Sequence, residues 1–130
     1  MPLMKIDLIK GQYEPAAIKD IMQHSFDVAK ETLLLPDRDR YQIVTQHEDY
    51  EINFQDVGLG YERSEKVLFF TILSTPRSVK NKKAFTKLLV ETLADKDGVR
   101  QEDVIISFME NHAEDWSFGE GKNHFLNGDL

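Results

Sequence analysis

Pro2 is the first residue of this chain whose chemistry stands out. It follows Met1, and removal of Met1 would leave a free secondary amine at the start of an apolar segment. An α-amine has a reference pKa of about 7.7–8.0, so burial can turn it into a base and a nearby carboxylate can keep it a cation. Proline after an initial methionine is also common without any chemical purpose, and the dipeptide alone does not decide between the two interpretations.

Asp39 is a second candidate, because it lies in a charged connection between two expected elements. The connection reads Pro36-Asp37-Arg38-Asp39-Arg40-Tyr41. Connections of this kind often carry functional residues. If the strands before and after the connection are parallel, Asp39 lies at the same sheet edge as Pro2 and comes within reach of its amine. The alternative is a solvated charge cluster at the end of a helix.

Arg77 is the third candidate, in the segment Thr75-Pro76-Arg77-Ser78. A guanidinium can hold a substrate carboxylate with two parallel hydrogen bonds. Arg77 follows an expected strand, so it reaches the edge of Pro2 only if that strand runs antiparallel to the strand that Pro2 begins. A pseudo-twofold between the two halves of the chain would give this arrangement. Otherwise Arg77 is a surface residue at a helix start.

A weak internal repeat with an offset of 64 residues suggests which elements position these residues. The paired segments are Leu3–Leu8 with Val67–Ile72, Ile18–Leu35 with Lys82–Val99, and Asp39–Val44 with Asp103–Phe108. Each half therefore reads as strand, helix, strand. Nearly all such units have a right-handed crossover with parallel strands, so each helix covers one face of the sheet.

Both expected helices carry one apolar face. The positions on these faces are Ile18, Ile21, Met22, Ser25, Ala29 and Leu33 in the first, and Phe85, Leu88, Leu89, Thr92 and Leu93 in the second. Their spacing of three and four residues is that of an amphipathic helix. Pro15 suits the first turn of one helix and Pro36 marks its end, while Ser78 and Gly98 bound the other.

The expected fold is one α+β domain over residues 1–130. Two βαβ units, at about 2–47 and 66–110, form a four-stranded sheet with both helices on one face. The segments Val67–Leu73 and Val104–Met109 are almost wholly apolar, which indicates strands buried on both faces. Since the helices leave one sheet face open, we expect oligomerisation to cover it. The tail over 111–130 is rich in aromatic residues and should pack on the protein.

Composition excludes several function classes. The net charge of −7 leaves no basic surface for nucleic acid, and no segment approaches the length of a membrane helix. The chain has no cysteine, which excludes thiolate chemistry and disulfides and makes a cytoplasmic location the default expectation. Its four histidines show no metal-ligand spacing, so we expect neither a metal nor a cofactor.

Taken together, these motifs resemble the tautomerase superfamily, and within it the malonate semialdehyde decarboxylase-like branch. The resemblance rests on Met1-Pro2-Leu3, Asp39-Arg40-Tyr41-Gln42, Gly58-Leu59-Gly60-Tyr61, Pro76-Arg77-Ser78, Asp103-Val104, Glu110-Asn111 and Asp115-Trp116-Ser117-Phe118-Gly119. It implies a homotrimer in which Pro2 is the catalytic amine, Asp39 acts beside it and Arg77 binds the substrate carboxylate. It also implies that Trp116 and Phe118 form an apolar wall around the substrate.

The chain departs from this branch at one substrate-binding position. Members of the branch often carry an Arg-Pro-Arg pattern, and this chain has Thr75 in place of the first Arg. The expected function is acid–base chemistry on a small oxo acid, either keto–enol tautomerisation or decarboxylation of a malonate semialdehyde-type substrate. Hydration or dehalogenation of a 3-haloacrylate-type acid, and carboxylate binding without catalysis, remain alternatives.

Overall fold

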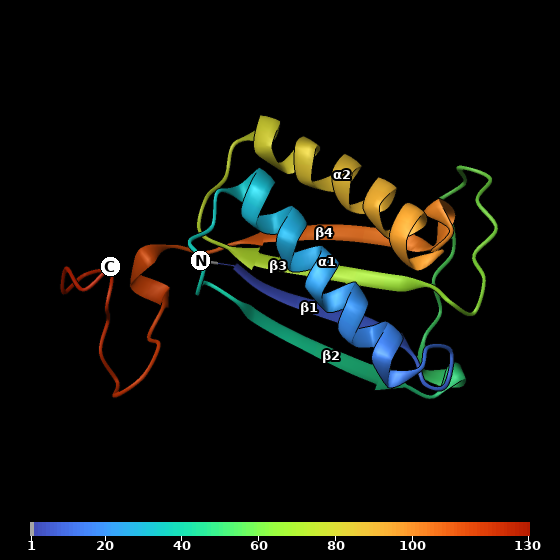
Figure 1. Cartoon of the computed structure of the whole chain (residues 1–130), viewed down its shortest axis with the longest axis horizontal. Helices are drawn as coiled ribbons and strands as arrows, with labels where there is room; N and C mark the ends of the chain where they lie inside the picture. The colour runs from blue at the N-terminus through green and yellow to red at the C-terminus, as the bar shows by residue number, and fades with distance from the viewer. Residues whose placement is uncertain (1) are drawn as a thin grey trace.

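The computed structural model describes residues 2–130 as a four-stranded sheet with two long helices on one of its faces (Figure 1). The elements in chain order are β1 (Pro2–Ile9), α1 (Pro15–Leu33), β2 (Tyr41–His47), β3 (Leu68–Ser74), α2 (Val79–Asp97) and β4 (Val104–Glu110). The predicted fold class is therefore confirmed. The predicted removal of Met1 lies outside the described residues.

The strand order β2-β1-β3-β4 joins the two halves through their first strands. β1 is parallel to β2, β3 is parallel to β4, and β1 is antiparallel to β3. Figure 1 shows the consequence: β1 and β2 begin at the end of the sheet where β3 and β4 finish. This is the arrangement that a common site for Pro2 and Arg77 requires.

The helices begin and end at residues whose capping or turn-forming chemistry can be read from the sequence. Pro15 occupies the first turn of α1, where its missing N–H leaves no helical hydrogen bond unmade. Ser78 caps α2, and its hydroxyl accepts a hydrogen bond from the Asn81 N–H at 3.1 Å. Gly98 ends α2 with φ of 64°, a left-handed conformation that glycine adopts without strain.

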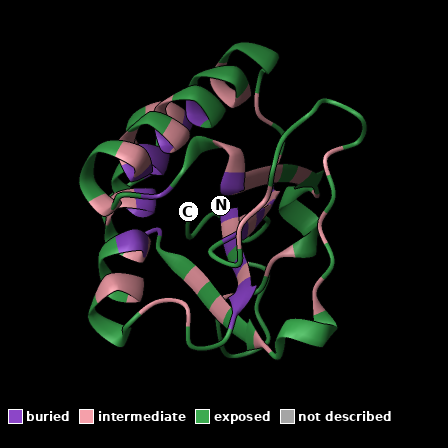
Figure 2. Cartoon of the chain, turned by 90° about the vertical axis from the view of Figure 1, so that its right-hand side faces the viewer, coloured by how far each residue is buried: buried purple, intermediate pink, exposed green. Residues whose placement is uncertain are grey.

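The core lies between the two helices and the sheet. Figure 2 shows buried residues on the sides of the helices that face the strands, and along the central strands. These residues include Met4, Ile6 and Leu8 of β1, Leu68, Phe70 and Ile72 of β3, Ile21, Ala29 and Leu33 of α1, and Phe85, Leu89 and Leu93 of α2. Alternate residues of β1 and β3 thus provide the floor on which both helices pack. Among residues 2–130, no helix is long and apolar enough to cross a membrane.

The opposite face of the sheet is only partly covered in the single chain, where the Phe54 ring stacks on Phe69 of β3 with centroids 5.1 Å apart. β3 alternates between fully and partly buried positions, whereas β4 is partly exposed along its whole length. The predicted burial of Val67–Leu73 and Val104–Met109 on both faces is therefore wrong for the isolated chain, because both helices cover the same face of the sheet (Figure 1). Ile43 and Met109 remain 50% and 56% exposed.

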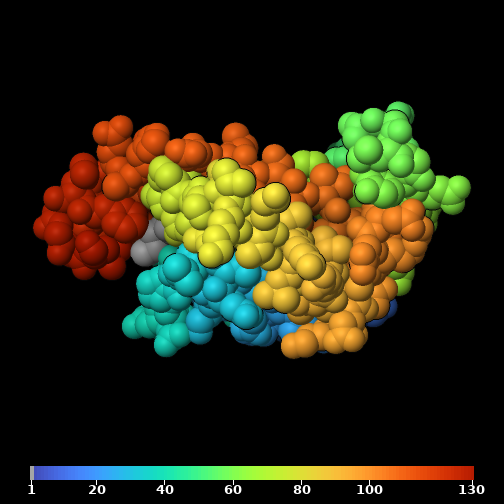
Figure 3. Space-filling view, turned by 90° about the horizontal axis from the view of Figure 1, so that it is seen from above, coloured from blue at the N-terminus to red at the C-terminus, as the bar shows by residue number. Residues whose placement is uncertain are grey.

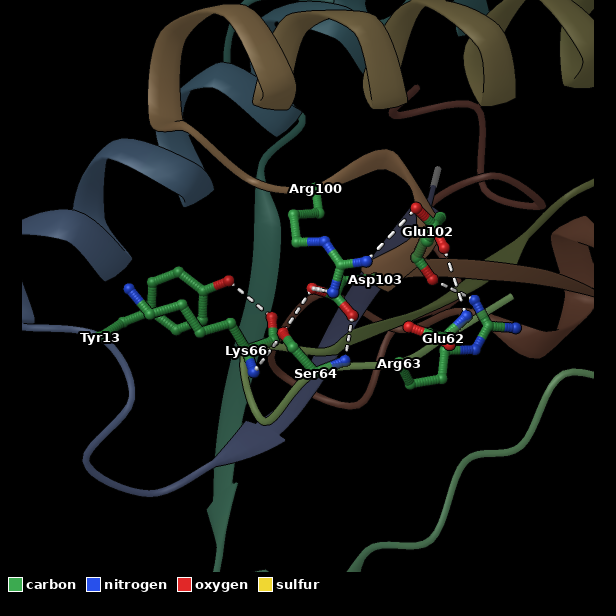
Figure 4. A network of polar contacts seen from close by, with 8 residues as sticks. All are labelled: Tyr13, Glu62, Arg63, Ser64, Lys66, Arg100, Glu102 and Asp103. Atoms are coloured by element: carbon green, nitrogen blue, oxygen red, sulfur yellow. Dashed lines mark hydrogen bonds and ion pairs between the residues drawn. The ribbon is translucent and has the colours of Figure 1, made fainter. Parts of the chain in front are cut away.

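A closed polar network ties the chain together at the end of the sheet away from Pro2 (Figure 4). The buried carboxylate of Asp103 accepts hydrogen bonds from the Ser64 N–H at 2.7 Å and the Ser64 hydroxyl at 2.5 Å. The Tyr13 hydroxyl donates to the Lys66 carbonyl at 2.6 Å. These contacts fix the segment that enters β3 against the start of β4.

The repeat relates this network to the opposite end of the sheet. Asp103 lies 64 positions after Asp39, and each of the two buried carboxylates lies just before an edge strand. Viewed from above in Figure 3, the red C-terminal segment and the green segment around residue 60 lie at opposite ends of the molecule. One carboxylate is enclosed by hydrogen bonds, and the other borders a cavity.

Candidate active site at one end of the sheet

Strand register brings the start of β1, the start of β2 and the end of β3 to one edge. Pro2 pairs with Ser74 of β3, and Leu3 pairs with Tyr41 of β2. Pro2 is buried there. Asp39 lies two residues before Tyr41, and Arg77 lies three residues after Ser74, so the connections that carry both residues leave the sheet beside Pro2.

Asp39 is held by a turn and points into the protein. Its N–H donates to the Pro36 carbonyl at 3.1 Å, and the residue is only 4% exposed. Together with Pro2 and Tyr41 it lines a small cavity of about 10 Å³. Burial raises the pKa of the Asp39 carboxyl above its ordinary value, while the positive charge of Arg77 acts in the opposite direction. The neutral, protonated form of Asp39 is therefore more favoured in this site than it would be in water.

Substitution of Asp39 by Asn should stabilise the fold increasingly as pH rises. Because the folded-state pKa lies above the unfolded one, protonated Asp39 contributes stability that is lost as pH rises through the folded-state value. Asn does not ionise, so the variant does not lose stability as pH rises. We expect the free energy of unfolding of Asp39→Asn to match the wild type near pH 3 and to exceed it at pH 7, measured by urea denaturation.

Asp37→Asn is a matched control of opposite sign. The Lys30 ammonium, 2.7 Å from the Asp37 carboxylate, lowers the pKa of this exposed acid. Ionised Asp37 contributes a small stabilisation of the fold, which is present above the unfolded-state pKa and is lost as pH falls. Asp37→Asn should therefore be slightly destabilising at pH 7. A pH-independent difference between Asp39→Asn and the wild type would contradict the assignment of a raised pKa.

Arg77 is fixed by oxygen atoms around its guanidinium. Its Nη1 donates to the Thr75 hydroxyl at 2.8 Å and to the carbonyls of Thr75 and Pro76 at 3.0 and 3.2 Å. Its Nε donates to the Leu33 carbonyl at 3.3 Å. Thr75 thus helps to orient Arg77, and its predicted contact with substrate stays a prediction. A guanidinium held in one plane is suited to binding a carboxylate.

The two arginines beside Asp39 lie in different surroundings. Arg40 donates to the side-chain carbonyls of Gln42 and Gln23, both at 2.8 Å, and its guanidinium lies 5.0 Å from the centre of the Phe26 ring. Arg40 therefore fastens the start of β2 to α1. Arg38 is exposed and lines a larger cavity.

This larger cavity adjoins the first and has a volume of about 460 Å³. Asp39 and Tyr41 border both cavities, and Phe118 and His124 from the tail contribute to the wall of the larger one. The Phe118 ring lies 5.5 Å from the Tyr41 ring, which fixes the tail against the start of β2. Phe118 thus borders the cavity beside Asp39, and its part in a wall around the substrate stays a prediction.

Trp116 packs beside Phe118. Its ring stacks on Phe118 with centroids 5.3 Å apart and an interplanar angle of 12°, and its indole N–H donates to the Asn111 side chain at 2.9 Å. Trp116 lines neither of the two cavities that Asp39 borders. Trp116 therefore supports Phe118, and its predicted place in the wall around the substrate stays a prediction.

Of the eight residues that line the larger cavity, the sequence predicted Asp39 and Phe118 as site residues and missed the other six, which are Pro36, Arg38, Tyr41, His124, Asp129 and Leu130. Arg38 and Tyr41 lie in the same charged connection as Asp39, so their closeness in sequence to a candidate residue was a usable signal. His124 gave no signal, because its place depends on the path of the tail. Among residues 2–130, no group of three or more His, Asp or Glu side chains is arranged to hold a metal ion.

Comparison with known proteins identifies relatives over the whole chain. The family model described as tautomerase enzyme matches residues 39–119. Two proteins of Bacillus subtilis (strain 168) are similar: “Probable tautomerase YrdN”, 36% identical over all of both chains, and “Probable tautomerase YusQ”, 31% identical over 97% of this chain and 99% of the other.

Solved structures give the same result in three dimensions. A malonate semialdehyde decarboxylase is 41% identical, with a TM-score of 0.95 over 98% of both chains. The FG41 malonate semialdehyde decarboxylase inhibited by 3-bromopropiolate is 34% identical, with a TM-score of 0.93 over 98% of this chain and 97% of the other. A fused 4-OT trimer, 16% identical with a TM-score of 0.77 over 97% of this chain and 98% of the other, shares the fold. The chain belongs to the tautomerase superfamily, in its malonate semialdehyde decarboxylase-like branch.

Proposed function

We propose that this protein is an enzyme that uses the Pro2 amine, freed by loss of Met1, to tautomerise or decarboxylate a small oxo acid. The observation that carries the proposal is the shared cavity of Pro2 and Asp39, at the sheet edge that Arg77 also borders. The relative with 41% identity supports it. That protein is a malonate semialdehyde decarboxylase, and its structure was also determined with alanine in place of its first proline.

In the proposed decarboxylation, Arg77 holds the substrate carboxylate and Pro2 acts on the 3-oxo carbon. The amine condenses with the carbonyl, releasing water and forming an iminium. The bond to the carboxylate then breaks, its electron pair enters an enamine and carbon dioxide leaves. A proton adds to the enamine carbon, and water releases the product from Pro2. The aromatic wall at Phe118 keeps water away from the carboxylate as its charge is lost.

The charge of Asp39 acts on the charge of Pro2. An ionised Asp39 raises the pKa of the amine and favours the cation, which polarises a 3-oxo group so that carbon dioxide leaves without an iminium. The neutral amine, which forms above its own pKa, condenses with the carbonyl as described above or moves a proton next to a carbonyl, which is tautomerisation. Burial raises the pKa of Asp39 and so weakens its stabilisation of the cation.

A hydratase activity is the second candidate. The relative with 41% identity is described with both decarboxylase and hydratase activities. In this chain Asp39 would activate water while the Pro2 ammonium polarises an unsaturated acid of the 3-haloacrylate type. The reaction needs an ionised Asp39 and a substrate without a carbonyl group, so no imine forms between Pro2 and the substrate.

We also propose a homotrimer. The open sheet face carries Ile43 and Met109, each at least half exposed, and burying such apolar side chains favours association. A structural neighbour of the same fold, the fused 4-OT, is a symmetric trimer. Each subunit would then cover the open sheet face of a neighbouring one.

Mass spectrometry after borohydride treatment with malonate semialdehyde or another small 3-oxo acid tests the proposed function. A stable adduct at Pro2 supports imine chemistry, whereas solvent deuterium entering the substrate without an adduct supports the tautomerase. If protein that has lost Met1 shows neither an adduct nor exchange, the result supports a carboxylate-binding protein without catalysis. Protein from its own host that keeps Met1 would contradict both reactions.

A further inference from the structure

We propose that Arg38 and His124 form a second anion-binding subsite beside Asp39, which makes oxo dicarboxylates the preferred substrates. The inference rests on the proposed function, because it assumes that the reacting carbons of the substrate lie near Pro2. Its evidence is separate. It comes from Arg38 and His124, two residues of the larger cavity that no step of the proposed mechanism uses.

Arg38 has an uncommitted guanidinium at the edge of this cavity. Arg77 and Arg40, the other arginines of this end of the sheet, donate to protein oxygen atoms. Within the part of the chain that the structure describes, Arg38 makes no hydrogen bond or ion pair, although it lines the cavity directly after the exposed Asp37 and before the buried Asp39. Its planar donors match a carboxylate group.

His124 supplies a second donor on the same wall. Its Nδ1 accepts a hydrogen bond from the Phe118 N–H at 3.2 Å. In the neutral ring the proton must then lie on Nε2, which becomes a hydrogen-bond donor. The Phe118 ring, 5.9 Å away, helps to hold the imidazole in place. The cavity thus combines a cation and an N–H donor with an aromatic surface.

The size of the larger cavity leaves room for a substrate longer than a three-carbon oxo acid. The space that Pro2 shares with Asp39 is about 10 Å³, while the adjoining cavity has about 460 Å³, within the range of pockets that hold drug-sized ligands. Asp39 and Tyr41 border both spaces. A substrate that reacts near Pro2 can therefore extend past them towards Arg38.

The negative charges around the cavity determine where a second carboxylate can bind. Asp39 lies at the inner end, where its charge, when ionised, repels an anion. Asp129 also lines the cavity, and no ion pair within residues 2–130 joins it to Arg38. The Arg38 guanidinium thus attracts an anion that binds beside it, and the negative charge of Asp129 weakens this binding. Asp129→Asn should strengthen its binding.

Calorimetric titration with paired ligands tests the subsite without relying on turnover. Glutarate differs from pentanoate, and succinate from butanoate, only by a carboxylate in place of a methyl group. We expect the wild type to bind at least one dicarboxylate about 10- to 100-fold more tightly than its partner. Arg38→Ala should remove this preference, Arg38→Lys should retain part of it, and Asp129→Asn should enlarge it.

Lys122→Ala is the matched control. Like Arg38→Ala, it removes one positive charge, here from the tail. Lys122 pairs with Glu120 at 2.8 Å and does not line the cavity. We expect its ligand preference to equal that of the wild type. Equal affinities for both members of each pair in the wild type, or equal losses in Arg38→Ala and Lys122→Ala, would overturn the subsite.

Turnover of acetoacetate and oxaloacetate separates the subsite from the proposed function. Both are 3-oxo acids, and oxaloacetate has a carboxylate where acetoacetate has a methyl group. Arg38→Ala should raise KM about 10-fold or more for oxaloacetate and leave acetoacetate unchanged. An equal effect on both substrates overturns the subsite while Pro2-dependent turnover stands. Turnover unaffected by Pro2→Ala overturns the proposed function, and the calorimetric preference then still reports on Arg38.

Discussion

Replacing Pro2 with Ala is expected to lower kcat for a 3-oxo acid by about 10²- to 10⁴-fold, the range that a positioned acid–base group contributes. The variant keeps a free α-amine once Met1 is removed, but this amine is primary and lacks the ring that fixes its direction at the start of β1. We therefore expect a large loss with some residual turnover. Steady-state kinetics on protein whose N-terminus has been verified by mass spectrometry measures it.

Pro15→Ala controls for the chemical change itself. Pro15 is exposed in the first turn of α1, which begins beyond the end of β1 opposite to Pro2. Its substitution should leave kcat and KM unchanged. If Pro2→Ala turned over substrate at the wild-type rate, the amine would have no part in the reaction. A low rate in both variants would instead point to a general effect of proline loss on folding.

Asp103→Ala is expected to lower the free energy of unfolding by about 2–4 kcal/mol. Asp103 is fully buried and accepts two short hydrogen bonds from Ser64, so its removal leaves the Ser64 N–H without its acceptor and opens a space between β4 and the segment before β3. The Arg100 guanidinium, 3.8 Å away and half exposed, can return to water. Urea denaturation at pH 7 measures the loss.

Glu102→Ala is the control for this network. Glu102 is the adjacent acid and pairs with Arg100 at 3.3 Å, but it is 44% exposed, so its substitution should cost less than about 1 kcal/mol. The catalytic rate of Asp103→Ala at a temperature where it is fully folded should be close to that of the wild type, because Asp103 lies at the far end of the sheet from Pro2. Similar stability losses for Glu102→Ala and Asp103→Ala would show that burial of Asp103 is not the cause.

Local chemistry in the sequence was sufficient to predict the elements. The two helices begin and end where Pro15, Ser78, Pro36 and Gly98 indicated, because capping and left-handed conformations depend only on neighbouring residues. The turn at Gly58-Leu59-Gly60 also has a local origin, since the Asp56 carboxylate accepts hydrogen bonds from the N–H groups of Gly58 and Gly60. The repeat then reduced the topology to a single question, the relative direction of β1 and β3.

The contrast between Asp39 and Asp103 shows where sequence reasoning ended. The repeat makes the two residues equivalent, and both are buried before an edge strand. Their neighbours in space differ, because Ser64 from a segment outside the repeat closes over Asp103, while the tail residues Phe118 and His124 leave a cavity beside Asp39. Neither contact has a periodicity or spacing that a sequence pattern can reveal.

The sequence by itself determined the helices, the strands, the family motifs and the three residues around which a site could form. Only the tertiary structure decided that β1 and β3 are antiparallel, which brings the Arg77 connection to the edge of Pro2, and that Thr75 holds Arg77 while Trp116 supports Phe118. It also made Arg38 a cavity residue and Arg40 a structural one. The reason is physical: caps and helix faces are set by near neighbours, whereas strand pairing and the path of the tail depend on packing between distant segments.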